Sequence, residues 1–217
     1  MTSYTRLPLM ARMAYIVMCV ETYLVHVHPD RDWRPLARAF WHFPQWCICD
    51  WLFFYAELTP DVALHHPNYD DLHEGIQCDI SRQDYECLIR QYHGITEGNA
   101  DDPHDELCAV LNIPFDLINE YDAYLSDGDV VHNTRWPLES SLGYLKAIEK
   151  ILSRHSIEMP DMHALDFLAI TDEKMLAEIE KIESDAIMDI DYGAIPARAL
   201  WGPRYEGEPL SIILNAV

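Results

Sequence analysis

The chain has 217 residues, 49% of them hydrophobic, and a formal net charge of −22 at pH 7. This length and apolar content allow one domain with a sizeable core, and composition does not exclude two small domains. A negative charge of this size argues against direct nucleic-acid binding and against attachment to anionic membranes, and it favours a basic protein partner.

The charge is unevenly distributed along the chain. Residues 1–60 carry five acidic and five basic side chains, so the net charge lies on residues 61–217. We therefore predict a single helical domain, with an aromatic core-forming half at about 1–60 and an acidic helical half at about 61–217. Solubility alone is an equally good explanation of the charge, because net charge is generic evidence.

The first predicted element is a helix from Leu7 to about Val27, with apolar residues at helical intervals. Arg12 and Glu21 interrupt this apolar run, and each would cost about 2.5–3.5 kcal/mol at the centre of a membrane span. Glu21 and the lack of an A-x-A-like cleavage site also argue against a signal peptide. We expect a core helix in a cytoplasmic protein, with Glu21 reaching the surface.

Residues 33–55 are rich in tryptophan, phenylalanine and tyrosine, and their large apolar areas predict the centre of the core. This region should contain a helix capped by Asp32 and ended by Pro44, followed by a second helix at about 46–58. Thr59 and Pro60 then predict the start of a short helix toward residue 65.

The acidic half also reads as helices joined by turns, and residues 67–77 have the polar composition of a surface loop. The first predicted helix covers 81–94, with Ser81 and Asp84 as a capping box. Asp102 and Pro103 open the next helix, which Pro114 should kink or split. Two more helices are predicted at 137–155 and from the cap Thr171 to about 187. Residues 209–214 are extended and apolar, as in a strand or in a tail lying in a groove. The predicted fold class is mainly α, a single-domain irregular helical bundle with a possible short C-terminal strand.

No residue pattern indicates catalysis. The six cysteines lack a CxxC pair and a disulfide-framework spacing, and they lie on apolar segments, which is typical of free buried thiols in a reducing compartment. Nucleophile and phosphate-loop motifs are missing from the sequence. We expect no catalytic residue, no cofactor and no metal.

Histidines and clustered acids leave metal binding open as an alternative. Neutral imidazoles bind zinc, but His26 and His28 would diverge by about 200° on a helix. The acidic clusters do not have the EF-hand spacing that calcium sites require. Helix caps, turns and solvent-exposed histidines explain these residues more simply. They are His26, His28, His65, His66 and His73, together with Asp101, Asp102, Asp105, Glu106, Asp127 and Asp129.

The C-terminal stretch WGPRYEGEPLSIIL, residues 201–214, carries a family resemblance. Three further features carry the same resemblance: a D-x-D-W motif at 30–33, a tryptophan-rich helix through Trp41, Trp46 and Trp51, and an acidic segment at 95–107. Together these features resemble a group of small acidic bacterial proteins, several of them immunity proteins of polymorphic-toxin systems. Such proteins end in a GWG-like motif followed by LSIIL; here Leu200 replaces the first glycine, and residues 173–197 resemble an insertion.

The resemblance implies a non-catalytic cytoplasmic protein that binds its cognate toxin and covers the toxin's active site or an adjacent surface. If the toxin is a nuclease, an acidic inhibitor can compete for the basic site that holds phosphates. The predicted contact residues are those of the acidic loops: Asp101, Asp102, Asp105, Glu106, Asp127 and Asp129. Two alternatives stay open: an acidic nucleic-acid mimic that inhibits a DNA-binding protein, and a histidine-dependent metal-binding enzyme.

Overall fold

The computed structural model describes residues 4–92, 106–126, 135–184 and 190–216. These residues are mainly α-helical and contain no strand, which confirms the predicted fold class. The α-helices are α1 (Leu9–Val27), α2 (Arg34–Phe40), α3 (Ile48–Ala56), α4 (Pro60–His65), α5 (Glu74–Asp79), α6 (Arg82–Tyr92), α7 (Glu106–Ser126), α8 (Arg135–Arg154), α9 (Glu173–Glu183) and α10 (Ala197–Trp201). Short 3-10 helices are η1 (Tyr4–Arg6), η2 (Tyr69–Asp71), η3 (Met162–Leu168), η5 (Tyr192–Ala194) and η6 (Glu208–Leu210).

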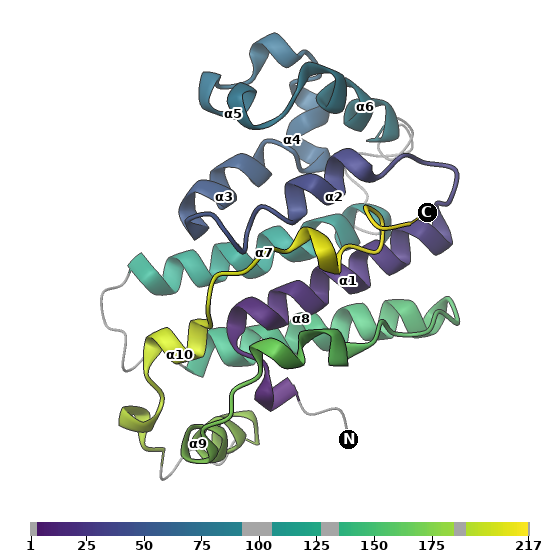
Figure 1. Ribbon diagram of the computed structural model, residues 1–217. Helices are drawn as coiled ribbons and strands as arrows, with labels where there is room; N and C mark the ends of the chain where they lie inside the picture. The colour runs from purple at the N-terminus through teal and green to yellow at the C-terminus, as the bar shows by residue number, and fades with distance from the viewer. Residues whose placement is uncertain (1–3, 93–105, 127–134, 185–189, 217) are drawn as a thin grey trace.

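The fold is built around α1. This helix packs against α7 and α8, which also contact each other; α2 to α6 lie toward one end of the molecule, and η1 and α9 lie toward the other (Figure 1). Residues 9–24 are buried throughout, as expected for a helix that is apolar on nearly every side. Of the described helices, α1 alone is long and apolar enough to cross a membrane, a test that buried core helices also pass.

Both charged side chains of α1 are fully buried, at 0% exposure. The expectation that Glu21 reaches the surface is therefore wrong. The Arg12 guanidinium donates to the carbonyls of Leu7 (3.0 Å) and Leu138 (3.3 Å) and to Ser141 Oγ (3.0 Å), and it forms an ion pair with Glu183 (2.5 Å). A buried charge is tolerated when it is paired and hydrogen-bonded, as the Arg12 guanidinium is here. Because its partners lie on α8 and α9, Arg12 also connects α1 to distant parts of the chain.

The Glu21 carboxylate accepts hydrogen bonds from Trp41 Nε1 (2.9 Å), Ser211 Oγ (2.7 Å) and the backbone N–H groups of Ile212 (2.6 Å) and Ile213 (3.4 Å). The C-terminal tail therefore lies against α1, seen as the yellow trace in Figure 1. Because these N–H groups point to a side chain, residues 209–214 form η6 and a turn instead of the short strand considered above.

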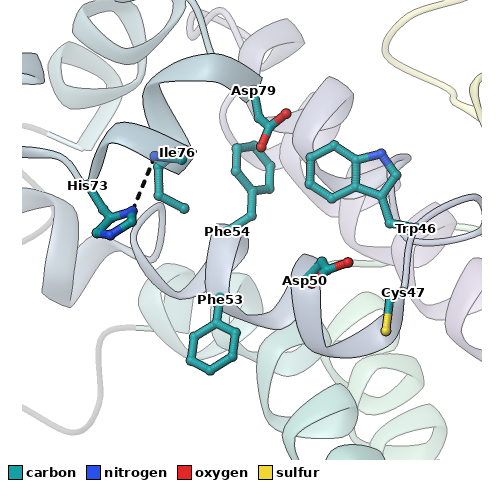
Figure 2. A pocket seen from close by; sticks show the side chains of 9 residues that line it. Trp46, Cys47, Asp50, Phe53, Phe54, His73, Ile76 and Asp79 are labelled. Atoms are coloured by element: carbon teal, nitrogen blue, oxygen red, sulfur yellow. Dashed lines mark hydrogen bonds between the residues drawn. The ribbon is translucent and has the colours of Figure 1, made fainter.

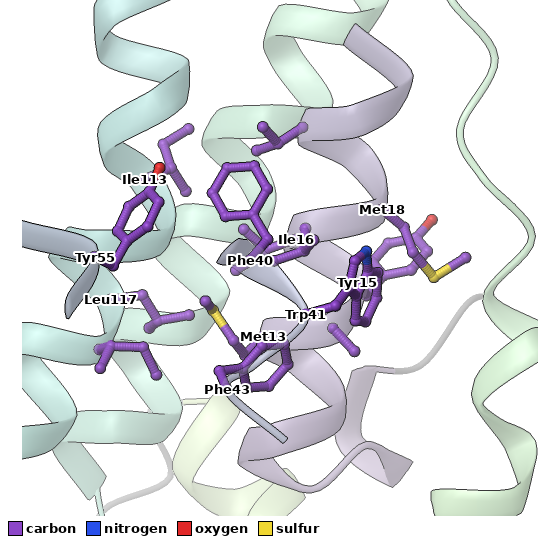
Figure 3. Packing of buried hydrophobic residues seen from close by; sticks show 14 of the residues in the cluster. Met13, Tyr15, Ile16, Met18, Phe40, Trp41, Phe43, Tyr55, Ile113 and Leu117 are labelled. Carbon is purple, nitrogen blue, oxygen red and sulfur yellow. The ribbon is translucent and has the colours of Figure 1, made fainter. Parts of the chain in front are cut away.

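Most of the aromatic stretch forms the core, as predicted. Figure 3 shows Phe40, Trp41 and Phe43 packed among side chains from α1, α3 and α7. The Trp51 and Tyr55 rings stack at 4.8 Å with an interplanar angle of 8°. Phe53 is the exception, because it is 73% exposed.

Several local predictions are wrong. Residues 67–77 were expected to form a surface loop, but they contain η2 and the first four residues of α5. The reason is that Leu72 and Ile76 are buried and anchor this otherwise polar segment to the core. Asp172, not Thr171, caps α9 by accepting from the N–H groups of Lys174 and Met175. At Pro114 the chain continues as the single helix α7, so it is not split there, as one of the two predicted outcomes had it.

Candidate functional site

The structure describes one of the six predicted contact residues. Asp101, Asp102, Asp105, Asp127 and Asp129 lie outside the described residues. Glu106 begins α7 and faces the end of α8, where it forms ion pairs with Arg154 Nη2 and His155 Nε2, both at 2.5 Å. Of this predicted set, the structure therefore places Glu106.

The Glu106 carboxylate interacts with other side chains of the fold. Its Oε1 also accepts from the Tyr23 hydroxyl at 3.2 Å. Burial opposes ionisation, but the hydrogen bond from His155 and the charges of Arg154 and His155 outweigh it and hold the pKa of Glu106 below its usual value. The Glu106 carboxylate is therefore already engaged within the fold by Arg154, His155 and Tyr23.

A larger acidic site lies at the η1 and α9 end of the molecule. There, side chains of η1, α1, α8, the segment 158–171 and α9 enclose a groove of roughly 1190 Å³. Five carboxylates line it: Glu149, Glu158, Asp161, Asp166 and Glu180. The described lining includes two basic side chains, Arg6 and His163. We call this feature the acidic groove.

Local hydrogen bonds fix part of its rim. The Asp161 carboxylate accepts from the backbone N–H of His163 at 2.9 Å and so caps η3. The His163 ring lies 3.1 Å from the Asp166 carboxylate, and this hydrogen bond raises the pKa of His163. Glu158 and Glu180 are exposed. The groove therefore combines carboxylates that hold its own backbone with carboxylates that face solvent.

Its inner wall contains two tyrosines beside a partly buried carboxylate. The Tyr4 hydroxyl donates to Glu149, and burial raises the pKa of Glu149. The Tyr4 and Tyr15 rings lie 5.9 Å apart, and the Tyr15 hydroxyl donates to the carbonyl of Pro160 at 3.0 Å. Aromatic faces next to carboxylates suit the guanidinium or ammonium group of a basic side chain.

Sequence reasoning did not single out these residues. The carboxylates of the groove belong to three separate segments, and no local motif links them. The signal that was present is the location of the whole net charge on residues 61–217. It placed the acids in the right part of the chain without indicating which of them meet.

The cysteines and histidines form no metal cluster in the described parts of the chain, where no group of three or more histidine, cysteine or acidic side chains could hold an ion. The expectation that all cysteines are buried is wrong, since Cys47 and Cys78 are exposed. Cys19 is buried in α1, and this burial raises the pKa of its thiol.

The chain matches no known protein-family model, no curated protein sequence and no solved structure.

Proposed function

We propose that this chain is a non-catalytic cytoplasmic binding protein that neutralises a basic protein partner, in the manner of an immunity protein acting on its cognate toxin. The observation that carries the proposal is the acidic groove. Its lining holds five carboxylates against two basic side chains, in a chain whose net charge is −22.

Electrostatic complementarity explains how such a groove would act. A negative field speeds the encounter with a basic surface and disfavours acidic competitors, and salt screens this effect over roughly 8–10 Å. If the partner is a nuclease or another phosphate-binding toxin, its basic active site supplies that surface. Covering the site requires no chemistry from the inhibitor.

Tyr4 and Tyr15 give the groove a means of selecting basic side chains beyond charge alone. An arginine or lysine entering beside Glu149 would meet its carboxylate and the half-buried Tyr4 ring, which the 3% exposed Tyr15 ring contacts. Arginine, with its planar group, fits this combination better than lysine.

The test is co-purification of the full chain with each protein encoded beside its gene, followed by binding kinetics at two salt concentrations. Glu158→Lys should weaken binding of the captured partner roughly tenfold, mainly through slower association, because it reverses a charge on the groove wall. Glu86→Lys is the matched control, since it makes the same charge change on an exposed position of α6 at the other end of the molecule.

We expect the control to bind within about twofold of the wild type. Equal losses in both variants would show that only total charge matters, and unchanged binding in both would refute the groove. Failure to capture any basic protein partner would refute the proposed function itself.

A further inference from the structure

A second groove lies between α3 and α5, at the end of the molecule away from the acidic groove (Figures 1 and 2). It encloses roughly 510 Å³. Its apolar lining is formed by Trp46, Phe53, Phe54 and Ile76. Two carboxylates, Asp50 from α3 and Asp79 from α5, also line it and are exposed. We call it the α3–α5 groove.

Phe53 is the unusual residue of this groove. It is 73% exposed, whereas its neighbour Phe54 is 2% exposed. Figure 2 shows the two rings pointing in different directions from the same turn of α3. An exposed phenylalanine at the edge of an apolar groove gains little from folding and offers apolar area that a bound partner would bury.

The opposite wall is held in place by aromatic contacts. The Trp46 ring stacks on His42 at 4.6 Å with an interplanar angle of 18°, and it lies 5.2 Å from the Phe54 ring. Burial lowers the pKa of His42, which favours a neutral ring in this stack. A wall that is already ordered loses little side-chain freedom when a ligand binds.

The charges around the groove define the complementary ligand. The described lining contains no lysine or arginine. His73 Nδ1 accepts from the backbone N–H of Gly75 at 3.2 Å and so caps α5. Asp50 and Asp79 therefore leave the groove with a negative rim around an apolar floor.

We propose that the α3–α5 groove binds a short linear segment of another protein, in which an apolar side chain packs against Phe53 and Trp46 while neighbouring lysines or arginines pair with Asp50 and Asp79. This surface is independent of the acidic groove and does not require the proposed function. A second copy of the chain fits less well, because it would bring like-charged rims together on molecules that each carry a net charge of −22.

The test begins with selection of random dodecapeptides displayed on phage against the immobilised full-length chain. Enriched peptides are synthesised, and their affinity is measured by fluorescence anisotropy. We expect enrichment of an apolar residue flanked by lysine or arginine, and affinity that falls as salt rises. Phe53→Ala should weaken binding roughly tenfold, as for an anchor residue.

Phe167→Ala is the matched control, because Phe167 is 64% exposed but lies on η3, far from the groove. It should change affinity less than about twofold. Asp79→Asn keeps the side-chain size, and it should weaken binding and reduce the salt dependence. Circular dichroism of each variant checks that the fold is retained.

The proposal is overturned if no peptide is enriched, if the enriched peptides are acidic, or if they bind Phe53→Ala as well as the wild type. Concentration-dependent dimerisation that Phe53→Ala abolishes would replace it with self-association. Glu158→Lys should leave peptide binding unchanged, so failure of the acidic groove and failure of the α3–α5 groove give different results.

Discussion

The buried carboxylate of Glu21 should be one of the strongest single determinants of stability in this chain. It lies on α1 and receives hydrogen bonds from Trp41 and from the C-terminal tail, 190 residues away from it in sequence at Ser211. We expect Glu21→Ala to reduce the free energy of unfolding by about 3 kcal/mol and to release the tail from α1.

The magnitude follows from the donors left without an acceptor. Three of them approach Glu21 at 2.6–2.9 Å, namely Trp41 Nε1, Ser211 Oγ and the Ile212 N–H, whereas the Ile213 N–H is longer at 3.4 Å. Each buried donor without a partner costs about 1–3 kcal/mol, so three cost about 3–9 kcal/mol. Removing a carboxylate that had to leave water offsets part of this loss, which gives a value near the lower end.

Urea unfolding followed by far-ultraviolet circular dichroism measures the loss, with an unchanged slope expected if the native and unfolded states keep their exposed areas. Hydrogen exchange reports the tail directly, because the Ile212 amide should lose its protection in the variant. Glu206→Ala is the control: it removes an exposed glutamate from the same tail and should change stability by less than about 0.5 kcal/mol.

A loss below about 1 kcal/mol, with the Ile212 amide still protected, would refute this reasoning. That result would mean that apolar packing of the tail is sufficient and that the hydrogen bonds to Glu21 contribute little beyond those the unfolded chain makes with water.

Four further predictions concern the stability of the fold. Gly207→Ala places a Cβ 2.5 Å from Trp41 Cε3 and should lower the free energy of unfolding by about 1–3 kcal/mol, measured by thermal unfolding. Gly143→Ala adds a Cβ that meets nothing within 4 Å, and the same measurement should show α8 stabilised by up to about 1 kcal/mol. Arg12→Met leaves the Glu183 carboxylate without its ion pair and should cost about 3–5 kcal/mol in urea unfolding, part of which Arg12→Met with Glu183→Gln recovers. Burial raises the pKa of Glu21 above 4.5, although its hydrogen bonds oppose this shift. Folding therefore favours the protonated carboxyl group. The stability that this preference adds is complete below the unfolded-state pKa and is lost as pH rises through the folded-state pKa. The stability of the wild type relative to Glu21→Gln should therefore decrease as pH rises from 4 to 7, and an increase would contradict this sign.

Elements set by local signals could be predicted from the sequence. The apolar stripe of 137–155 corresponds to α8, and Ser81 Oγ accepts from the backbone N–H of Asp84 at 3.1 Å, as the capping pattern predicts. The helix α5 was missed because it is only six residues long and has too few apolar positions to show a period.

Features that depend on distant partners could not be predicted in this way. Periodicity identifies Glu21 as a polar residue in an apolar helix, but the groups that donate hydrogen bonds to it come from parts of the chain that no local window contains. Phe53 carried a weaker signal: consecutive residues on a helix point about 100° apart, so a helix at the edge of the core exposes part of an apolar run, and α3 exposes Phe53 while Phe54 and Tyr55 are buried. The carboxylates of the acidic groove meet only because η1, α8 and α9 pack together.

The C-terminal motif that carries the family resemblance is used in this chain to hold the tail. Gly202 has φ +87°, and its Cβ would lie 2.9 Å from Pro8, while Gly207 has room for no side chain against Trp41. Ser211 and Ile212 then supply donors to Glu21. Each of these residues has a structural reason that involves no partner.

In this chain the WG…LSIIL-like ending packs the C-terminus onto α1, whereas the proposed binding residues lie in the acidic groove and in the α3–α5 groove. Specificity should be sought in those grooves: exchanging Phe53 or Glu158 should change binding while leaving the tail in place, and changing Ser211 or Gly207 should change stability first.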